Sequence, residues 1–129
     1  MNNGGRVFVA IGATSGAIAV ALGAFAAHRL KHDIAPEMLS IFETAARYQM
    51  YHSLALVATG FALHFQPSQF AQLLRGAGWC FISGTMLFSG SLYILVVLDQ
   101  SWLGAITPLG GLMFIGGWCL LALSFFRRA

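Results

Sequence analysis

A polar cluster occupies residues 47–52 of a chain that carries few polar side chains elsewhere. Within six positions it gathers a cation, two phenols, an amide and an imidazole: Arg47, Tyr48, Gln49, Tyr51 and His52. These groups donate or accept hydrogen bonds, and the guanidinium also binds anions. The cluster is therefore a candidate binding site for the polar head group of a lipid or a quinone.

Two flanking residues extend this candidate site. Helical residues four apart lie on one face, so Glu43, Arg47 and Tyr51 share one stripe. We expect the Glu43 carboxylate to pair with the Arg47 guanidinium across one turn. His28 ends the preceding apolar stretch, and we expect it to reach the same membrane surface as His52. We also expect His52 to face the bundle interior, or a shallow polar pocket shared with the end of the first helix.

Neither metal binding nor catalysis is predicted from these residues. Two imidazoles, His28 and His52, suit a haem or a metal, but zinc takes four protein ligands, or three and a water, and no Cys or acidic partner is obvious nearby. Ser53 follows His52 directly, yet adjacent helical residues point about 100° apart, so they do not form a nucleophile and its base. Residues 107–111 are glycine-rich but lack the lysine of a phosphate-binding loop. We expect no cofactor, no metal and no catalytic residue.

The composition indicates a membrane protein. Of 129 residues, 58% are hydrophobic and 9% are charged, whereas an ordinary soluble domain has about 25% charged residues. Three long stretches, 7–27, 76–98 and 102–126, hold no charged side chain. Each is long enough to cross about 30 Å of hydrocarbon at 1.5 Å per residue. The first stretch imitates a signal peptide, but it exceeds the usual apolar core of about 7 to 15 residues, so we expect a retained span.

A fourth apolar stretch, residues 53–65, is too short to span a membrane alone. Counting back about 20 residues from the stop signal at Gln66 sets its other membrane edge near Ala46, so the polar cluster is expected at the membrane surface. Upstream, residues 36–47 form a predicted amphipathic helix. The predicted fold is one all-α domain over residues 1–129. It is an integral membrane four-helix antiparallel bundle whose second helix is extended by an amphipathic N-terminal stretch, with spans near 7–27, 45–65, 76–98 and 103–126.

The charges constrain partners and orientation. The net charge of +3 comes from scattered cations without the basic stripe and interleaved aromatics of a nucleic-acid surface. All four carboxylates lie outside the predicted hydrocarbon core, which argues against a proton-coupled carrier. With Arg47 assigned to the interface, Arg29 and Lys31 lie on one side and four arginines on the other: Arg6, Arg75, Arg127 and Arg128. The positive-inside rule then predicts that both termini are cytoplasmic.

Small residues are dense on the predicted helix faces. Gly12 and Gly16 form a GxxxG pair, and the last span carries two Gly-Gly pairs. Such faces let helices approach closely in lipid. The expected partners are therefore membrane lipids and, through Gly, Ala and Ser faces, another protein or further copies of the chain. Cys80 and Cys119 each follow a tryptophan, and we expect them as reduced thiols at similar depth in an antiparallel helix pair.

Four strings, in order, carry a family resemblance. They are GAFAAH at 23–28, RYQMYH at 47–52, FSGSLY at 88–93 and ITPLGG at 106–111. Together they resemble the small membrane proteins grouped as domain of unknown function 423, the YgdD-like inner-membrane proteins of bacteria, over nearly the whole chain. The resemblance implies four membrane helices in a bacterial cytoplasmic membrane. It implies no known reaction, substrate or cofactor.

Three function classes follow from the sequence. The small-residue faces and the lack of a catalytic set favour a non-enzymatic accessory or membrane-organising protein. The alternative is a protein that binds a lipid or quinone head group at the polar cluster. A small transporter or membrane enzyme is the third class, and almost nothing in the sequence supports it.

Overall fold

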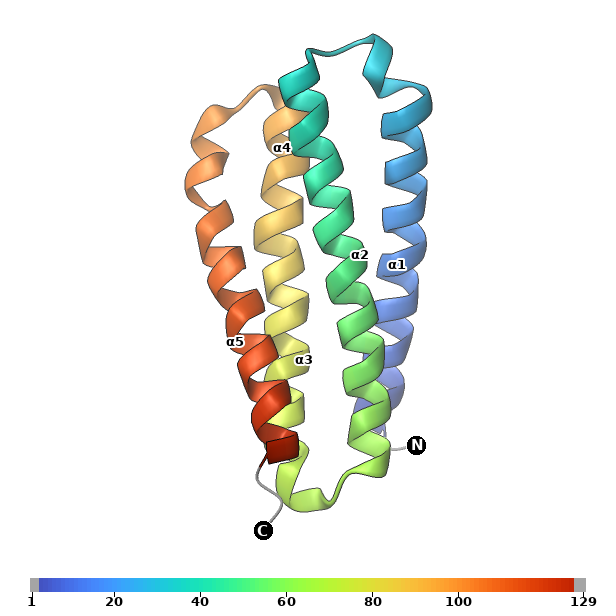
Figure 1. Ribbon diagram of the computed structural model, residues 1–129, viewed down its shortest axis with the longest axis vertical. Helices are drawn as coiled ribbons and strands as arrows, with labels where there is room; N and C mark the ends of the chain where they lie inside the picture. The colour runs from blue at the N-terminus through green and yellow to red at the C-terminus, as the bar shows by residue number, and fades with distance from the viewer. Residues whose placement is uncertain (1–2, 127–129) are drawn as a thin grey trace.

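A computed structural model describes residues 3–126, which form an antiparallel four-helix bundle (Figure 1). The third helix is continuous through a π-helical turn, η3, so α3 and α4 together make one rod. Short 3-10 turns join the rods. The elements are α1 (Asn3–His28), η1 (Leu30–His32), α2 (Pro36–Phe65), η2 (Ser68–Phe70), α3 (Ala71–Thr85), η3 (Met86–Gly90), α4 (Ser91–Leu98), η4 (Ser101–Ala105) and α5 (Thr107–Phe126). The predicted all-α four-helix fold is confirmed.

The second helix, α2, is one unbroken helix of 30 residues, which confirms the predicted upstream extension. Pro36 lies in the first turn of α2, where backbone N–H groups have no acceptor within the helix, so the missing N–H of proline costs no hydrogen bond. Ala35 before it is extended. The helix ends at Phe65, one residue before Gln66, and Pro67 follows. At 1.5 Å per residue α2 is about 45 Å long, enough to run the length of the bundle.

Three segments of the described chain are long and apolar enough to cross a membrane: Asn3–His32, Ser68–Leu98 and Ser101–Phe126. They contain the first, third and fourth predicted spans. The segment around α2 is not among them, since its polar cluster lowers the hydropathy of that helix. The span predicted at 45–65 therefore stays a prediction. Arg127 and Arg128, which the expected orientation uses, lie outside the described residues.

Close backbone approach pairs α1 with α2 and α5 with α3. A Cβ built on Gly12 would lie 2.8 Å from the Ser53 carbonyl oxygen, and one on Gly60 would lie 2.7 Å from the Gly5 carbonyl oxygen. On α5, a Cβ at Gly110 would meet the backbone nitrogen of Phe88 in the π-helical turn. The small-residue faces of the sequence are therefore used, at these positions, for packing within the bundle.

The α3–α5 pairing also sets the depth of the two cysteines. Gly117 lies against Phe81 and Cys80, so Cys119 is about half a helical turn from the level of Cys80. The predicted similar depth of the two cysteines is confirmed, and both are free thiols in the structure.

The apolar core occupies the half of the bundle nearer the start of α1. Phe8 of α1, Leu56 of α2, Leu74 and Phe81 of α3, and Phe114 of α5 are all buried there. Toward the other end, buried apolar residues such as Phe42 and Leu95 are accompanied by hydrogen bonds between the helices. The Ser89 hydroxyl of the π-helical turn donates to the Ala45 carbonyl oxygen at 2.7 Å, which ties η3 to α2.

Candidate ligand groove

The polar cluster lies level with the centres of the three uncharged stretches. Gly16, one residue from the centre of 7–27, packs against Met50 and Ser53. Phe88, one residue from the centre of 76–98, stacks on Tyr48 with ring centroids 4.7 Å apart. Phe114, at the centre of 102–126, stacks on His52. Each uncharged stretch thus meets α2 within residues 48–53.

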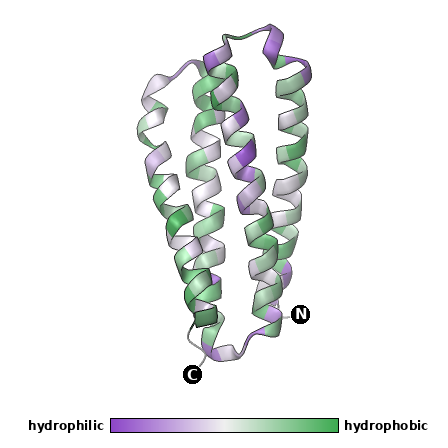
Figure 2. Cartoon of the chain, in the orientation of Figure 1, coloured by the Kyte–Doolittle hydropathy of each residue, from purple (hydrophilic) through white to green (hydrophobic). Residues whose placement is uncertain are grey.

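In this register the cluster lies level with the middle of the uncharged stretches and not with their ends, where the expectation of a membrane-surface position puts it. Figure 2 shows the hydrophilic segment of α2 part of the way along the helix, between its two ends. The expected position follows from taking the end of α2 at Gln66 as one membrane edge and counting back about 20 residues to the other edge. In the structure α2 begins at Pro36, and its residues 50–57 lie against Gly12 and Gly16 in the uncharged part of α1.

Two expectations are wrong. His28 ends α1 beside the turn to α2, whereas His52 lies 16 residues after Pro36, about 24 Å along the helix, so the two imidazoles do not meet. Glu43 and Arg47 form no ion pair. Within residues 3–126 the one ion pair joins Arg29 Nε to Asp33 Oδ2 at 3.5 Å, in the turn after α1.

His52 is buried, with 5% of its surface exposed, and it faces the bundle interior as expected. It faces α5, however, and not the end of α1. Its ring lies parallel to Phe114, with centroids 3.4 Å apart and planes at 4°. Nδ1 is 2.7 Å from the Tyr48 carbonyl oxygen, and the Trp118 indole N–H donates to Nε2 at 3.2 Å. Because Nε2 accepts, the proton is on Nδ1 and is donated to Tyr48.

Gln49 is also buried, and it links three helices. Its Nε2 donates to the Ser15 carbonyl oxygen at 3.0 Å, and its Oε1 accepts from the Tyr93 hydroxyl at 2.7 Å. The Ser53 hydroxyl donates to the Ser15 hydroxyl at 2.8 Å. These bonds tie α2 to α1 and α4, so Gln49 serves the structure of the bundle.

Three cluster residues, Tyr48, Tyr51 and His52, line a groove of about 570 Å³, whereas Arg47 lies outside it. Its neighbours on α2, η3 and α5 are Tyr48, Tyr51, His52, Phe88, Gly111, Phe114, Ile115 and Trp118. No lining residue is charged, and most of the wall is aromatic. Tyr51 and Trp118 are 51% and 47% exposed at the rim, so the groove opens sideways from the bundle.

Two phenol groups in this groove are free to donate. For neither the Tyr48 hydroxyl nor the Tyr51 hydroxyl is there a hydrogen-bond partner in the described chain, and the two rings lie 5.9 Å apart. The His52 and Trp118 nitrogens, by contrast, satisfy each other. The groove therefore has mostly aromatic walls, and two of its lining residues carry phenol hydroxyls without a partner in the described chain.

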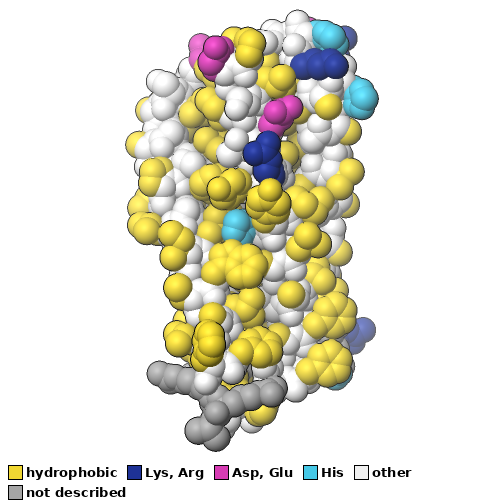
Figure 3. Space-filling model, viewed as in Figure 1, with side chains coloured by type: hydrophobic (Ala, Val, Ile, Leu, Met, Phe, Trp, Pro, Cys, Tyr) yellow, Lys and Arg dark blue, Asp and Glu magenta, His cyan; other side chains and the backbone are white. Residues whose placement is uncertain are grey.

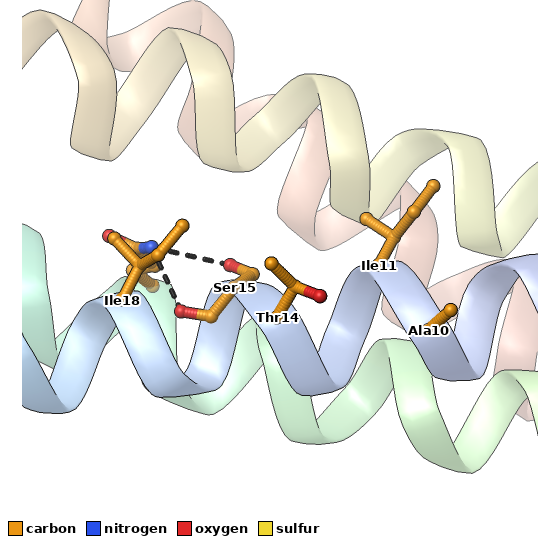
Figure 4. A pocket seen from close by; sticks show the side chains of 6 residues that line it. Ala10, Ile11, Thr14, Ser15 and Ile18 are labelled. Atoms are coloured by element: carbon orange, nitrogen blue, oxygen red, sulfur yellow. Dashed lines mark hydrogen bonds between the residues drawn. The ribbon is translucent and has the colours of Figure 1, made fainter.

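A second, shallower pocket of about 360 Å³ lies along α1 (Figure 4). Ser15 and Thr14 line it with apolar neighbours, and Gln49 lies at its base. Figure 4 shows the amide bonded to both oxygens of Ser15. The Gln49 amide and the Ser15 hydroxyl are thus already hydrogen-bonded within the bundle.

Sequence reasoning missed the groove residues outside α2. Phe88, Phe114 and Trp118 are apolar residues of apolar helices, and no spacing rule sets them apart. The FSGSLY string at 88–93 is the nearest signal, since it carries Phe88. No group of three or more His, Cys, Asp or Glu side chains that could hold a metal occurs among residues 3–126.

Comparison with known proteins places the chain in a family. The family described as "Protein of unknown function (DUF423)" matches residues 22–111. A UPF0382 membrane protein of Staphylococcus aureus (strain bovine RF122) is 42% identical over 96% of this chain and 98% of the relative. The UPF0382 membrane protein YwdK of Bacillus subtilis (strain 168) is 42% identical over 92% of this chain and 95% of the relative. No solved structure matches. The chain belongs to the DUF423 family of membrane proteins.

Proposed function

We propose that this chain is a non-enzymatic membrane protein that holds the ring of a quinone in the groove between α2 and α5. The observation that carries the proposal is the groove itself, an uncharged aromatic slot of about 570 Å³ with phenolic donors, level with the centres of the uncharged stretches. Its volume is within the usual range for small-ligand pockets, about 300 to 1,000 Å³.

The depth and the lining favour a quinone over a phospholipid. A phospholipid head group is charged and lies at the membrane surface, whereas a quinone ring is neutral and can enter the hydrocarbon. Tyr48, His52 and Phe114 place the groove near the middle of the apolar stretches, and no cation lines it to bind a phosphate. A planar ring fits between flat aromatic walls, which favour offset stacking.

The free phenol hydroxyls orient the bound quinone ring. A quinone carbonyl accepts hydrogen bonds, and the Tyr48 and Tyr51 hydroxyls are donors without another partner in the described chain. In hydrocarbon such a bond competes with no water. The open side of the groove gives the isoprenoid tail an exit into lipid, so the ring can enter without any opening of the bundle.

The proposal includes a position in the membrane. α2 packs along α1 on one side and along α3 and α4 on the other, so it crosses the bilayer if they do. Its buried polar residues then face the bundle interior, where polar groups of membrane helices are found. The compartment is the bacterial cytoplasmic membrane with both termini cytoplasmic. The tally of cations at the two ends supports this orientation.

Quinone quenching of tryptophan fluorescence tests the groove. Purified protein in nanodiscs, with Trp79 and Trp102 replaced by Phe so that Trp118 alone emits, is titrated with a short-tailed ubiquinone and a short-tailed menaquinone. Gly111→Leu fills the groove, and Gly116→Leu is the matched control, since a Cβ at either glycine meets no atom within 4 Å and Gly116 does not line the groove.

Saturable quenching that Gly111→Leu weakens by about tenfold or more, and Gly116→Leu leaves unchanged, is the expected result. Quenching that is linear in quinone, or equal in the two leucine variants, would reflect quinone dissolved in the bilayer and would overturn the proposal.

A further inference from the structure

A second surface of α2, which shares no lining residue with the quinone groove, carries two charges that join no ion pair within residues 3–126. Glu43 and Arg47 line a shallow depression of about 360 Å³ with Ala19, Gly23 and Ala46. Arg47 is exposed and Glu43 is half-buried, and neither joins an ion pair within residues 3–126. Figure 3 shows one acidic and one basic side chain side by side on the front face, away from the ends and surrounded by hydrophobic side chains.

The neighbours on α1 fix the depth of these charges. Ala19 and Gly23 belong to the uncharged stretch 7–27, two and six residues from its centre. At 1.5 Å per residue these offsets are about 3 and 9 Å, inside half of the 30 Å hydrocarbon layer, so this register puts Glu43 within the layer, whereas the sequence predicts all four carboxylates outside it. An unpaired charge that faces lipid at this depth is strongly unfavourable, and such residues pair with one another or mark a functional surface.

We propose that the depression lined by Ala19, Gly23, Glu43, Ala46 and Arg47 docks a second copy of this chain, with Arg47 of each copy bound to Glu43 of the other. The face carries one acid and one base, so it is complementary to itself. A two-fold axis through it forms two reciprocal ion pairs and leaves no net charge. The bidentate geometry of a guanidinium on a carboxylate suits such a buried pair.

The rest of the face permits the approach that these pairs need. Gly23 is half-buried and a Cβ there would meet no atom within 4 Å, while Ala19 and Ala46 are buried beneath the depression, so no bulky side chain of these three residues blocks an incoming helix. Small residues at this spacing are typical of helix contacts in lipid. The other small faces, at Gly12 and Gly60, are already filled by packing within the bundle. A lipid tail, in contrast, could satisfy neither charge.

Charge exchange between two tagged copies tests this pairing. Two differently tagged chains are co-expressed, extracted into native nanodiscs and purified through one tag, and the other tag is measured. Glu43→Arg gives a face with two cations and Arg47→Glu gives one with two anions. Glu37→Arg is the matched control, because it makes the same change of charge six residues earlier on α2, outside the depression.

We expect the wild type and Glu37→Arg to co-purify as pairs, with a native mass of twice the 13.8 kDa chain. Each charge variant paired with itself should lose about tenfold or more of the co-purified partner, since like charges face each other. The mixture of Glu43→Arg with Arg47→Glu should restore it, because opposite faces then meet. A pair within one chain could not produce this rescue.

A wild type that is monomeric in nanodiscs, alone or with an unrelated protein, would overturn the proposal. So would a mixed pair that co-purifies no better than the like pairs. If the charge variants fail to insert, the uncharged variants Glu43→Gln and Arg47→Gln take their place. Each should then lose self-association while keeping its helical circular dichroism, and unchanged association would contradict the pairing.

Discussion

The imidazole of His52 lies flat against the ring of Phe114, with centroids 3.4 Å apart and planes at 4°. Residues 62 positions apart in the chain thus form one wall of the groove between α2 and α5. Hydrogen bonds at both ring nitrogens fix the orientation of the imidazole, through Tyr48 and Trp118. His52 is therefore a positioning residue that aligns the aromatic walls.

His52→Leu should keep the bundle folded and weaken the groove. The substitution removes the acceptor for the Trp118 indole N–H and the flat partner of Phe114, so the walls lose their alignment. We expect quinone affinity to fall by about tenfold and Trp118 emission to shift. His64→Leu, at the far end of α2, is the control. Equal affinity in both variants would show that His52 does not shape the groove.

Gln49→Leu should destabilise the bundle without reaching the groove. It removes the bond to Ser15 and leaves the half-buried Tyr93 hydroxyl without its acceptor. The expected loss of unfolding free energy is about 1–2 kcal/mol. Denaturation in mixed micelles measures it, with Gln100→Leu, at an exposed turn, changing stability by less than about 0.5 kcal/mol. A neutral Gln49→Leu would mean that this network adds little.

Gly110→Ala should be costly where Gly116→Ala is not. A Cβ at position 110 meets the backbone nitrogen of Phe88, and backbone cannot yield as a flexible side chain can. We expect a loss of about 1–3 kcal/mol in unfolding free energy. Gly116 has open space around it, so alanine there should be neutral or stabilising by up to about 1 kcal/mol, because alanine favours a helix. Equal melting temperatures would refute the contact between η3 and α5.

Nitroxide labels on Cys80 and Cys119 should report similar depth. The contact of Gly117 with Cys80 and Phe81 brings both cysteines to one level. Collision with oxygen and with a water-soluble nickel complex measures depth by paramagnetic resonance, one label at a time. A difference of more than about two helical turns, on the order of 11 Å, would mean that the α3–α5 register is different.

The sequence predicts the helices well because their determinants are local. Long uncharged stretches, Pro36 at a first turn and Pro67 after a last one act through nearby residues, and the four helical rods lie where these signals put them, although α5 begins at Thr107 after a 3-10 turn and the sequence does not predict the π-helical turn η3. The depth of the polar cluster, in contrast, has no local determinant. It depends on which residues of α1 and α5 lie beside α2, and the glycine contacts that set the register of α1 on α2 join residues 34 to 55 positions apart.

The same distinction between local and long-range determinants applies to the residues of the candidate site. Tyr48, Tyr51 and His52 are recognisable in the sequence because polar residues in an apolar chain stand out. Their aromatic partners do not, and the expected Glu43–Arg47 pair follows a helical spacing rule that these side chains do not obey. Gln49 shows the same limit, since its role depends on Ser15 and Tyr93, which only the fold brings to it.

The most direct test of the quinone groove is the amount of quinone retained by the protein. Wild type, Gly111→Leu and Gly116→Leu are extracted into native nanodiscs, and quinone per chain is quantified by mass spectrometry against empty nanodiscs of the same membrane. The groove predicts enrichment toward one quinone per chain in the wild type and in Gly116→Leu, and background in Gly111→Leu. Background quinone in all three, or equal enrichment in all three, would contradict it.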